Sequence, residues 1–288
     1  MPSRSFLRAM LVGAAVVVAV LLAVAAYRSL TGEPEQPTGN FDPANFVSEA
    51  PQLDAPYVVT DYEVVDAMLA MARVRPDDYV LDLGSGDGRI LIAAARSHGA
   101  RGLGIEIDPA RIREADANAS AARVGHLVQF RRQDLFETPL GEADVLTLYL
   151  TAEVNLRLRP RILEQMRPGA RVVSHDFDMG EWRPDARQQV GSAALYMWIV
   201  PARAEGSWRL EVDGRTATLQ IDQNFQQIEG TVTSEGGTSR VEQGRVVGRR
   251  VHFLADPGDG RRVFEGRISG DRILPIRGQS GWQAVRAG

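Results

Sequence analysis

Short apolar runs alternate with segments of helical spacing between about residue 57 and residue 204. Apolar runs of roughly four to eight residues bounded by turn residues are typical of buried strands, and apolar residues three and four apart are typical of helices. Strands are expected at residues 79–83, 101–107, 127–134, 143–150 and 170–177, with a late edge strand at 194–200. This alternation predicts an α/β fold, a Rossmann-like, doubly wound and mostly parallel sheet with helices on both faces.

Capping residues predict where the helices begin. Thr60 and Glu63 form a capping-box pattern, in which each side chain satisfies a free amide at a helix start, and apolar residues recur at helical spacing from Val64 to Ala72. Asp108 and Pro109 suit the N-cap and first turn of a later helix. Further helices are expected at residues 90–97, ended by Gly99, and at residues 158–166.

The pattern changes after about residue 205. Short, partly alternating apolar segments follow one another, and Gly, Asp and Asn separate them at intervals of about ten residues. This spacing is typical of an antiparallel meander. We therefore predict an α/β domain at residues 57–204 and a small antiparallel β barrel or sandwich at residues 205–288, in which no catalytic cluster is visible.

The first 30 residues form a separate segment. Ala9 to Ala26 is an uncharged run of 18 residues, which just reaches the length of a membrane-spanning helix. The small residues from Ala23 to Ala25 also suit cleavage by a signal peptidase. We favour an uncleaved single-pass anchor over a cleaved signal, followed at residues 31–56 by a flexible linker rich in Pro, Gly and acidic residues.

Composition narrows the classes of function. The chain of 288 residues carries a formal net charge of -4, which argues against a general nucleic-acid binder because such proteins need a basic face. Cysteine is absent, so the sequence excludes disulfides, thiolate nucleophiles and Cys-based zinc sites. Lysine is absent as well, and all 33 basic residues are arginine.

The sequence VLDLGSGDGRI places a Gly-rich turn between the first strand and a helix. A phosphate-binding P-loop requires a lysine, and a dinucleotide fingerprint requires glycine where Arg89 stands. Gly84, Gly86 and Gly88 instead follow Asp82 in the pattern D-x-G-x-G-x-G. This pattern suits S-adenosylmethionine, a ligand without phosphate, because the acid can meet the ammonium of its amino-acid end.

Two further acids fit the same ligand. Glu106 ends the second strand and is placed to accept from both ribose hydroxyls, as acids do in dinucleotide folds. Asp134 follows the third strand, where it can accept from the adenine amino group with Leu135 and Phe136 beside the ring. The predicted cofactor-binding residues are Thr60, Asp82, Gly84, Ser85, Gly86, Gly88, Glu106, Ile107, Asp134 and Leu135.

These motifs resemble those of the class I S-adenosylmethionine-dependent methyltransferases. More narrowly, residues 57–109 resemble the lysine methyltransferases that act on ATP synthase subunit c and on the adenine nucleotide translocase, with their bacterial relatives. The segments TLYLTAEVNLRLRPRIL and RVVSHDFDMGEW extend the resemblance to about Trp182. It covers somewhat under half of the chain and leaves out the C-terminal β domain.

The resemblance implies direct in-line methyl transfer, without a catalytic triad or a metal. It places the reacting region near Thr60, Tyr149, Asn155 and the SHDFD segment. Tyr149 ends the fourth strand, so it either orients the acceptor amine or packs against the sheet.

The SHDFD segment supplies two candidate catalytic acids, Asp176 and Asp178, as a general base or as substrate-orienting groups. We do not expect these acids to form a metal site with His175. Side chains alternate along a strand, so His175 and Asp176 should point to opposite faces of the sheet unless the chain bends there.

The leading hypothesis is a membrane-anchored bacterial methyltransferase that modifies lysine in a membrane-associated protein. The alternatives are a small-molecule or lipid methyltransferase and a non-catalytic binding protein. Arg4 and Arg8 precede the apolar run, so the positive-inside rule would export the domain. Because S-adenosylmethionine is made in the cytoplasm, we nevertheless expect the domain to face the cytoplasm.

Overall fold

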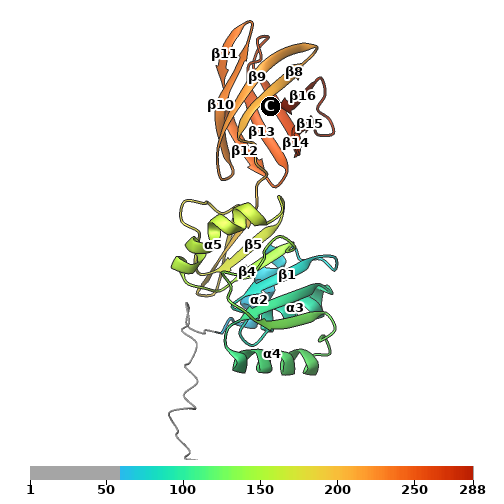
Figure 1. Cartoon of the computed structure of the whole chain (residues 1–288), viewed down its shortest axis with the longest axis vertical. Helices are drawn as coiled ribbons and strands as arrows, with labels where there is room; N and C mark the ends of the chain where they lie inside the picture. The colour runs from blue at the N-terminus through green and yellow to red at the C-terminus, as the bar shows by residue number, and fades with distance from the viewer. Residues whose placement is uncertain (1–58, 288) are drawn as a thin grey trace, which may run out of the picture. The chain divides into compact units, whose positions relative to one another are not determined.

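The computed structural model describes residues 59–287 (Figure 1). The predicted anchor at residues 1–30 and the predicted linker at residues 31–56 lie outside the described residues and stay predictions. Within residues 59–287, no helix is both long enough and apolar enough to cross a membrane.

A seven-stranded sheet confirms the predicted α/β fold. Its order is β3-β2-β1-β4-β5-β7-β6, and β7 is the strand that runs antiparallel to its neighbours. The strands are β1 (Tyr79–Leu83), β2 (Arg101–Glu106), β3 (Val128–Arg132), β4 (Val145–Leu148), β5 (Arg171–His175), β6 (Ala186–Val190) and β7 (Ala193–Ile199).

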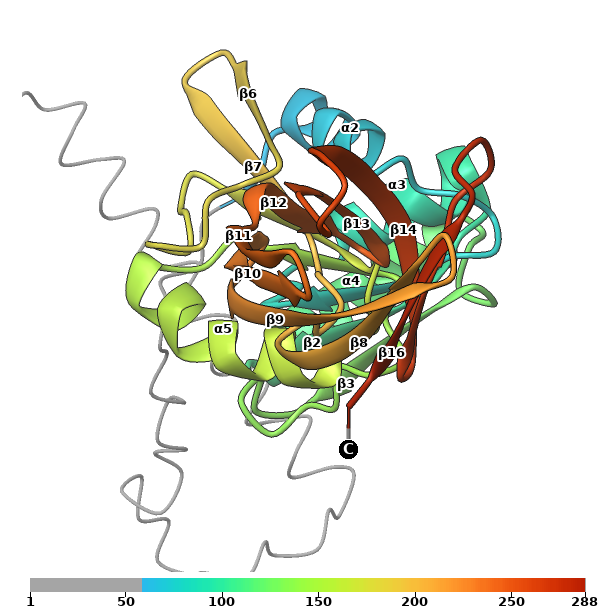
Figure 2. The ribbon, with the colours of Figure 1, turned by 90° about the horizontal axis from the view of Figure 1, so that it is seen from above.

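The edge of this sheet differs from the prediction. The strand expected at the edge is β7, which lies between β5 and β6, and β6 forms the edge instead. Figure 2 shows β6 and β7 as a hairpin. Residues 186–190 read ARQQV and are mostly exposed, so no apolar pattern marked them as a strand.

Four described helices cover the two faces of the sheet: α2 (Tyr62–Met71), α3 (Arg89–His98), α4 (Pro109–Ala121) and α5 (Ala152–Gln165). Val80, Val145 and Val173 share a buried cluster with residues of α2, α3 and α4. Leu81 and Leu146, the next residues along two of these strands, share another cluster with residues of α5. The period of two along each strand thus divides the core into two layers.

Two predicted helix starts are wrong, and one helix start and one helix end are confirmed. The N-cap of α2 is Asp61, without a capping bond from its side chain, so the Thr60 capping box does not form. Helix α5 begins six residues earlier than predicted, and Pro160 lies inside it. Asp108 caps α4 through the amide of Ala110, and Gly99 ends α3 with a φ of 69°, both as expected.

The C-terminal strands confirm a barrel-like antiparallel domain. They are β8 (Gly206–Val212), β9 (Arg215–Asn224), β10 (Gln227–Ser234), β11 (Gly237–Arg240), β12 (Glu242–Val247), β13 (Arg250–Ala255), β14 (Arg262–Ser269), β15 (Arg272–Pro275) and β16 (Trp282–Arg286). Pairing of β9 with β10 closes the sheet. Phe253, Phe264 and Trp282 are buried inside and contact one another, so large apolar side chains fill the interior.

Gly102 on β2 tests the packing of α3 against the sheet. An added Cβ would lie 2.5 Å from the Leu91 Cδ2 and 2.7 Å from the Val80 carbonyl oxygen. We expect Gly102→Ala to lower the free energy of unfolding by about 1–3 kcal/mol, as overpacking does. Chemical denaturation measures this, with Gly125→Ala as the control because an added Cβ there meets nothing within 4 Å. Equal stability of the two variants would contradict the packing described.

Candidate functional site

The polar residues of the site gather where the parallel strands end. Asp82 on β1 lies in register with Gly104 of β2 and Thr147 of β4. Carboxyl ends of parallel strands are where open α/β sheets bind ligands. The order of strands therefore brings together side chains that are far apart along the chain.

Asp82 is a buried acid of the site with one oxygen fixed by a hydrogen bond. Its side chain is buried, and its Oδ1 accepts a hydrogen bond from the Thr147 hydroxyl at 2.7 Å. Within the described residues, Asp82 Oδ2 and the nearby Ser85 Oγ are buried without a hydrogen-bond partner. Burial, and then the charges of Glu106 and Asp87, raise the pKa of Asp82 to about 7. A cationic ligand would satisfy this carboxylate, which is the fit expected for the ammonium of S-adenosylmethionine.

The backbone amides of the Gly-rich loop donate mainly to β2. The amides of Gly84 and Ser85 both donate to the Ile105 carbonyl, and the Gly88 amide donates to the Ser85 carbonyl. The Gly86 amide donates to the Glu106 carboxylate at 3.0 Å. Phosphate-binding loops need such amides free, so this loop offers acceptors to a ligand rather than an array of donors.

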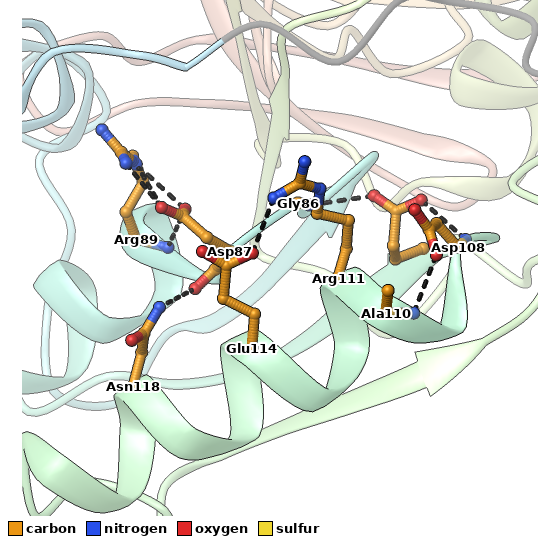
Figure 3. A network of polar contacts seen from close by, with 9 residues as sticks. Gly86, Asp87, Arg89, Asp108, Ala110, Arg111, Glu114 and Asn118 are labelled. Atoms are coloured by element: carbon orange, nitrogen blue, oxygen red, sulfur yellow. Dashed lines mark hydrogen bonds and ion pairs between the residues drawn. The ribbon is translucent and has the colours of Figure 1, made fainter. Parts of the chain in front are cut away.

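Glu106 holds the loop against the start of α4. Besides the Gly86 amide, its carboxylate accepts from the amides of Ile107 at 2.8 Å and Asp108 at 3.0 Å. Figure 3 shows Gly86 and Asp108 as members of one network of polar contacts. A carboxylate has about four acceptor positions, so three amides leave one position for a ribose hydroxyl. That Glu106 accepts from both ribose hydroxyls stays a prediction. It would require one of the three amides to lose its hydrogen bond to the carboxylate.

The predicted adenine residues lie on the turn after β3. Asp134 Oδ1 accepts from the Phe136 amide at 2.7 Å, which fixes the turn. Leu135 packs against the buried cluster on the α5 side of the sheet. The Arg157 guanidinium lies 3.8 Å from the centre of the Phe136 ring. One face of Phe136 is thus covered by Arg157, and stacking of adenine there stays a prediction.

Arg89 links the loop to the segment before α2, a role that the sequence analysis missed. Its Nε donates to Asp87 at 2.9 Å, and its Nη1 donates to the Thr60 carbonyl at 2.6 Å. Asn118 of α4 donates to the Asp87 carbonyl at 3.0 Å, so the loop is held from two helices (Figure 3). Arginine at this position gave no sequence signal beyond its departure from the dinucleotide fingerprint.

Thr60, Tyr149 and His175 meet on the other side of the site. The Thr60 hydroxyl lies 3.3 Å from the His175 Nδ1, and the Tyr149 and His175 rings stack with centres 3.8 Å apart. Burial, together with the charges of Asp176 and Asp61, raises the pKa of Tyr149. The sequence had placed Thr60 and Tyr149 in this region but had assigned no role to His175.

The bend after β5 corrects one expectation about the SHDFD segment. Asp176 has a φ of 61°, and its carboxylate lies 3.4 Å from the His175 Nε2. The two side chains therefore meet instead of pointing to opposite faces. Within the described residues, no group of three or more His, Asp and Glu side chains has the arrangement of a metal site.

Asn155 on α5 fixes the rest of this segment. Its Nδ2 donates to the Ser174 hydroxyl at 3.0 Å and to the Phe177 carbonyl at 3.1 Å. Asp178 accepts from the Gly180 amide at 2.9 Å and so caps a turn. The structure thus brings Asp176 to His175, which stacks on Tyr149, and uses Asp178 in a local turn. A catalytic role of either acid stays a prediction.

Comparisons with known proteins agree with this geometry. The family model of the ANTKMT methyltransferase domain matches residues 82–186. A protein-lysine N-methyltransferase of Saccharolobus islandicus is 43% identical over 130 residues, which are 45% of this chain and 81% of that protein. The adenine nucleotide translocase lysine N-methyltransferase of Mus musculus is 32% identical, with 54% of this chain and 66% of that protein covered.

A solved structure is also similar. An RNA methyltransferase from Salinibacter ruber, in complex with S-adenosyl-L-homocysteine, has 53% sequence identity and a TM-score of 0.50, with 51% of this chain and 95% of that chain covered. These matches confirm the predicted resemblance and the predicted cofactor, S-adenosylmethionine. They do not test the individual residues assigned to the site.

Binding of S-adenosylhomocysteine should depend on pH through Asp82. The ligand's ammonium pairs with the carboxylate form, and the pKa of Asp82 is about 7 in the unliganded protein. Affinity should therefore rise with pH, and calorimetric titration should give a dissociation constant about five to ten times weaker at pH 6 than at pH 7.5.

Two variants are matched controls for this titration. Asp82→Asn should remove most of the pH dependence, whereas Asp134→Asn should weaken binding and leave the pH dependence in place. Affinity that is the same at pH 6 and pH 7.5 in the parent protein would contradict the role of Asp82.

Proposed function

We propose that this chain, which belongs to the S-adenosylmethionine-dependent methyltransferases with an ANTKMT-type domain, methylates lysine side chains of a protein. The proposal rests on one feature of the structure, the Asp176 carboxylate held 3.4 Å from His175, whose ring stacks on Tyr149. Similarity to a protein-lysine N-methyltransferase over 81% of that protein's length supports the same acceptor.

The region around Tyr149 suits a positively charged acceptor. After burial, the charges of Asp176 and Asp61 are what raise the pKa of the Tyr149 phenol. The same two acids act on His175, whose pKa burial lowers. Two carboxylates beside an aromatic ring attract an ammonium group, and they would repel the phosphates of RNA.

Methyl transfer to an amine requires little acid–base catalysis from the protein. S-adenosylmethionine, when bound, supplies an activated methyl group whose thioether leaving group needs no proton. The protein has to bind the lysine, align its nitrogen and exclude water. Asp61 and Asp176 are placed to attract the ammonium form, and Asp176 to accept the proton that the nitrogen loses before it attacks.

RNA is the competing acceptor, because the similar structure from Salinibacter ruber is described as an RNA methyltransferase. The net charge of -4 and the acids around Tyr149 do not favour it. An RNA enzyme would be expected to present a basic face at the acceptor side. RNA therefore belongs in every acceptor assay as an alternative substrate.

A membrane location is the second part of the proposal. The uncharged run from Ala9 to Ala26, outside the described residues, would hold the enzyme at the inner membrane with its site toward the cytoplasm. The substrate would then be a protein in or at that membrane. A lipid or small-molecule acceptor is the alternative that the same location permits.

Neutralising the two acids should weaken capture of the lysine acceptor. With a lysine peptide as acceptor and radiolabelled S-adenosylmethionine, Asp61→Asn and Asp176→Asn should each raise KM for the peptide by about tenfold, a loss of about 1.4 kcal/mol. The affinity for S-adenosylhomocysteine should stay within about threefold of the parent, since neither side chain is among the residues that hold the cofactor loop.

Asp66→Asn is the matched control, because Asp66 is an exposed acid in the helix α2 that Asp61 precedes. Its KM should equal that of the parent. A KM unchanged in all three variants, or label that enters RNA and no lysine, would contradict the proposed acceptor.

Membrane attachment should depend on the apolar run. After expression in bacteria, the full chain should stay in the membrane pellet after alkaline carbonate extraction, and a deletion of residues 9–26 should move it to the supernatant. A full chain that is released by carbonate, or that is recovered shortened after Ala25, would contradict the uncleaved anchor.

A further inference from the structure

His175 lies at the centre of contacts that the methyl-transfer mechanism above does not use. Its side chain is 6% exposed and sits at the last residue of β5. Each polar atom of the ring faces a different partner: Nδ1 faces the Thr60 hydroxyl at 3.3 Å and Nε2 faces Asp176 Oδ2 at 3.4 Å. The ring face is covered by Tyr149, with centres 3.8 Å apart.

The partners of His175 determine where its proton lies. An ionised carboxylate attracts an N–H and only accepts hydrogen bonds, so the Asp176 carboxylate, 3.4 Å from Nε2, favours the tautomer that carries its hydrogen on Nε2. Nδ1 is then the acceptor of the neutral ring, and the Thr60 hydroxyl donates to it. This assignment satisfies all three groups with a single tautomer.

Asp176 is held from two sides in this arrangement. Its Oδ1 accepts from the Ala194 amide at 2.8 Å, and its own amide donates to the Ala194 carbonyl at 2.7 Å. The left-handed φ of 61° turns the carboxylate back over the imidazole. A non-glycine residue keeps such a conformation where its surroundings hold it in place, and here β7 and His175 do so.

The same contacts connect His175 to the cofactor loop. Thr60 accepts from Arg89 through its carbonyl oxygen at 2.6 Å, and Arg89 is paired with Asp87 between two glycines of the loop. Asp87, Arg89, Thr60, His175 and Asp176 therefore form a continuous chain of polar contacts from the cofactor side to the acceptor side.

We propose that His175 is a positioning residue: its Nε2–H orients the Asp176 carboxylate, and its ring fixes the face of Tyr149, for the incoming amine. The proposal deepens the proposed function and rests on it for the kinetic test below. His175 does not itself exchange a proton with the substrate, because both of its nitrogens are engaged with Thr60 and Asp176.

Two substitutions separate hydrogen bonding from stacking. His175→Phe keeps a ring against Tyr149 and loses both nitrogens, and His175→Gln keeps an N–H that reaches the position of Nε2. With the full chain and the lysine peptide, His175→Phe should lower kcat by about 10- to 100-fold, as misplaced catalytic groups do. His175→Gln should recover most of that loss, and KM for the peptide should change little in either variant.

Folding is checked by calorimetric binding of S-adenosylhomocysteine, which both variants should retain within about threefold of the parent, because the contacts of His175 are with Thr60, Tyr149 and Asp176 and not directly with the Gly-rich loop. A kcat of His175→Phe close to that of the parent would overturn the proposal. Equal losses in the Phe and Gln variants would overturn it too, because they would show that the Nε2–H has no separate role.

The tautomer gives a second test that needs no acceptor. Nitrogen-15 NMR of the full chain at pH 7.5 should show His175 as the Nε2–H form, with its signals among those of the four histidines identified by their loss in His175→Phe. Thr60→Val should shift these signals and Thr60→Ser should not. An Nδ1–H form in the parent would overturn the proposal, even if no lysine acceptor is found and the proposed function fails.

Discussion

A carboxylate buried near the end of β1, an interior strand of the sheet, constrains the rest of the site. Asp82 has one oxygen bonded to Thr147 and the other without a partner in the described residues. Burying such a group costs several kcal/mol unless a cation or donor meets it. The unliganded protein meets this cost by a pKa raised to about 7, and a ligand with an ammonium group would relieve it.

The proposed acceptor side also carries carboxylates. Thr60 contacts Arg89 through its carbonyl oxygen and His175 through its hydroxyl, so one residue links the Gly-rich loop to the segment after β5. Carboxylates lie at the proposed cofactor side on β1 and β2 and at the proposed acceptor side on the segment after β5. A site of this kind suits two positively charged reactants better than a polyanion.

Much of the fold could be predicted because its signals are local. Residues 79–83 form a buried apolar run that ends at a Gly-rich turn, and the acids after successive parallel strands had to meet at one edge. The parts that failed depend on tertiary contacts. Strand β6 is polar, helix α5 begins six residues before the predicted start, and the Thr60 hydroxyl bonds His175 instead of capping α2. The bend at Asp176 is held by β7, which no pattern around Asp176 could reveal.

The identity of the methylated atom tests the central claim most directly. The full chain would be incubated with isotopically labelled S-adenosylmethionine and with bacterial membranes, and protein, RNA and lipid fractions would be separated and hydrolysed. Because the chain has no lysine, any labelled methyllysine must come from another protein. The account predicts label in methyllysine of a membrane-fraction protein, lost with Asp82→Ala. Label confined to RNA or lipid would contradict it.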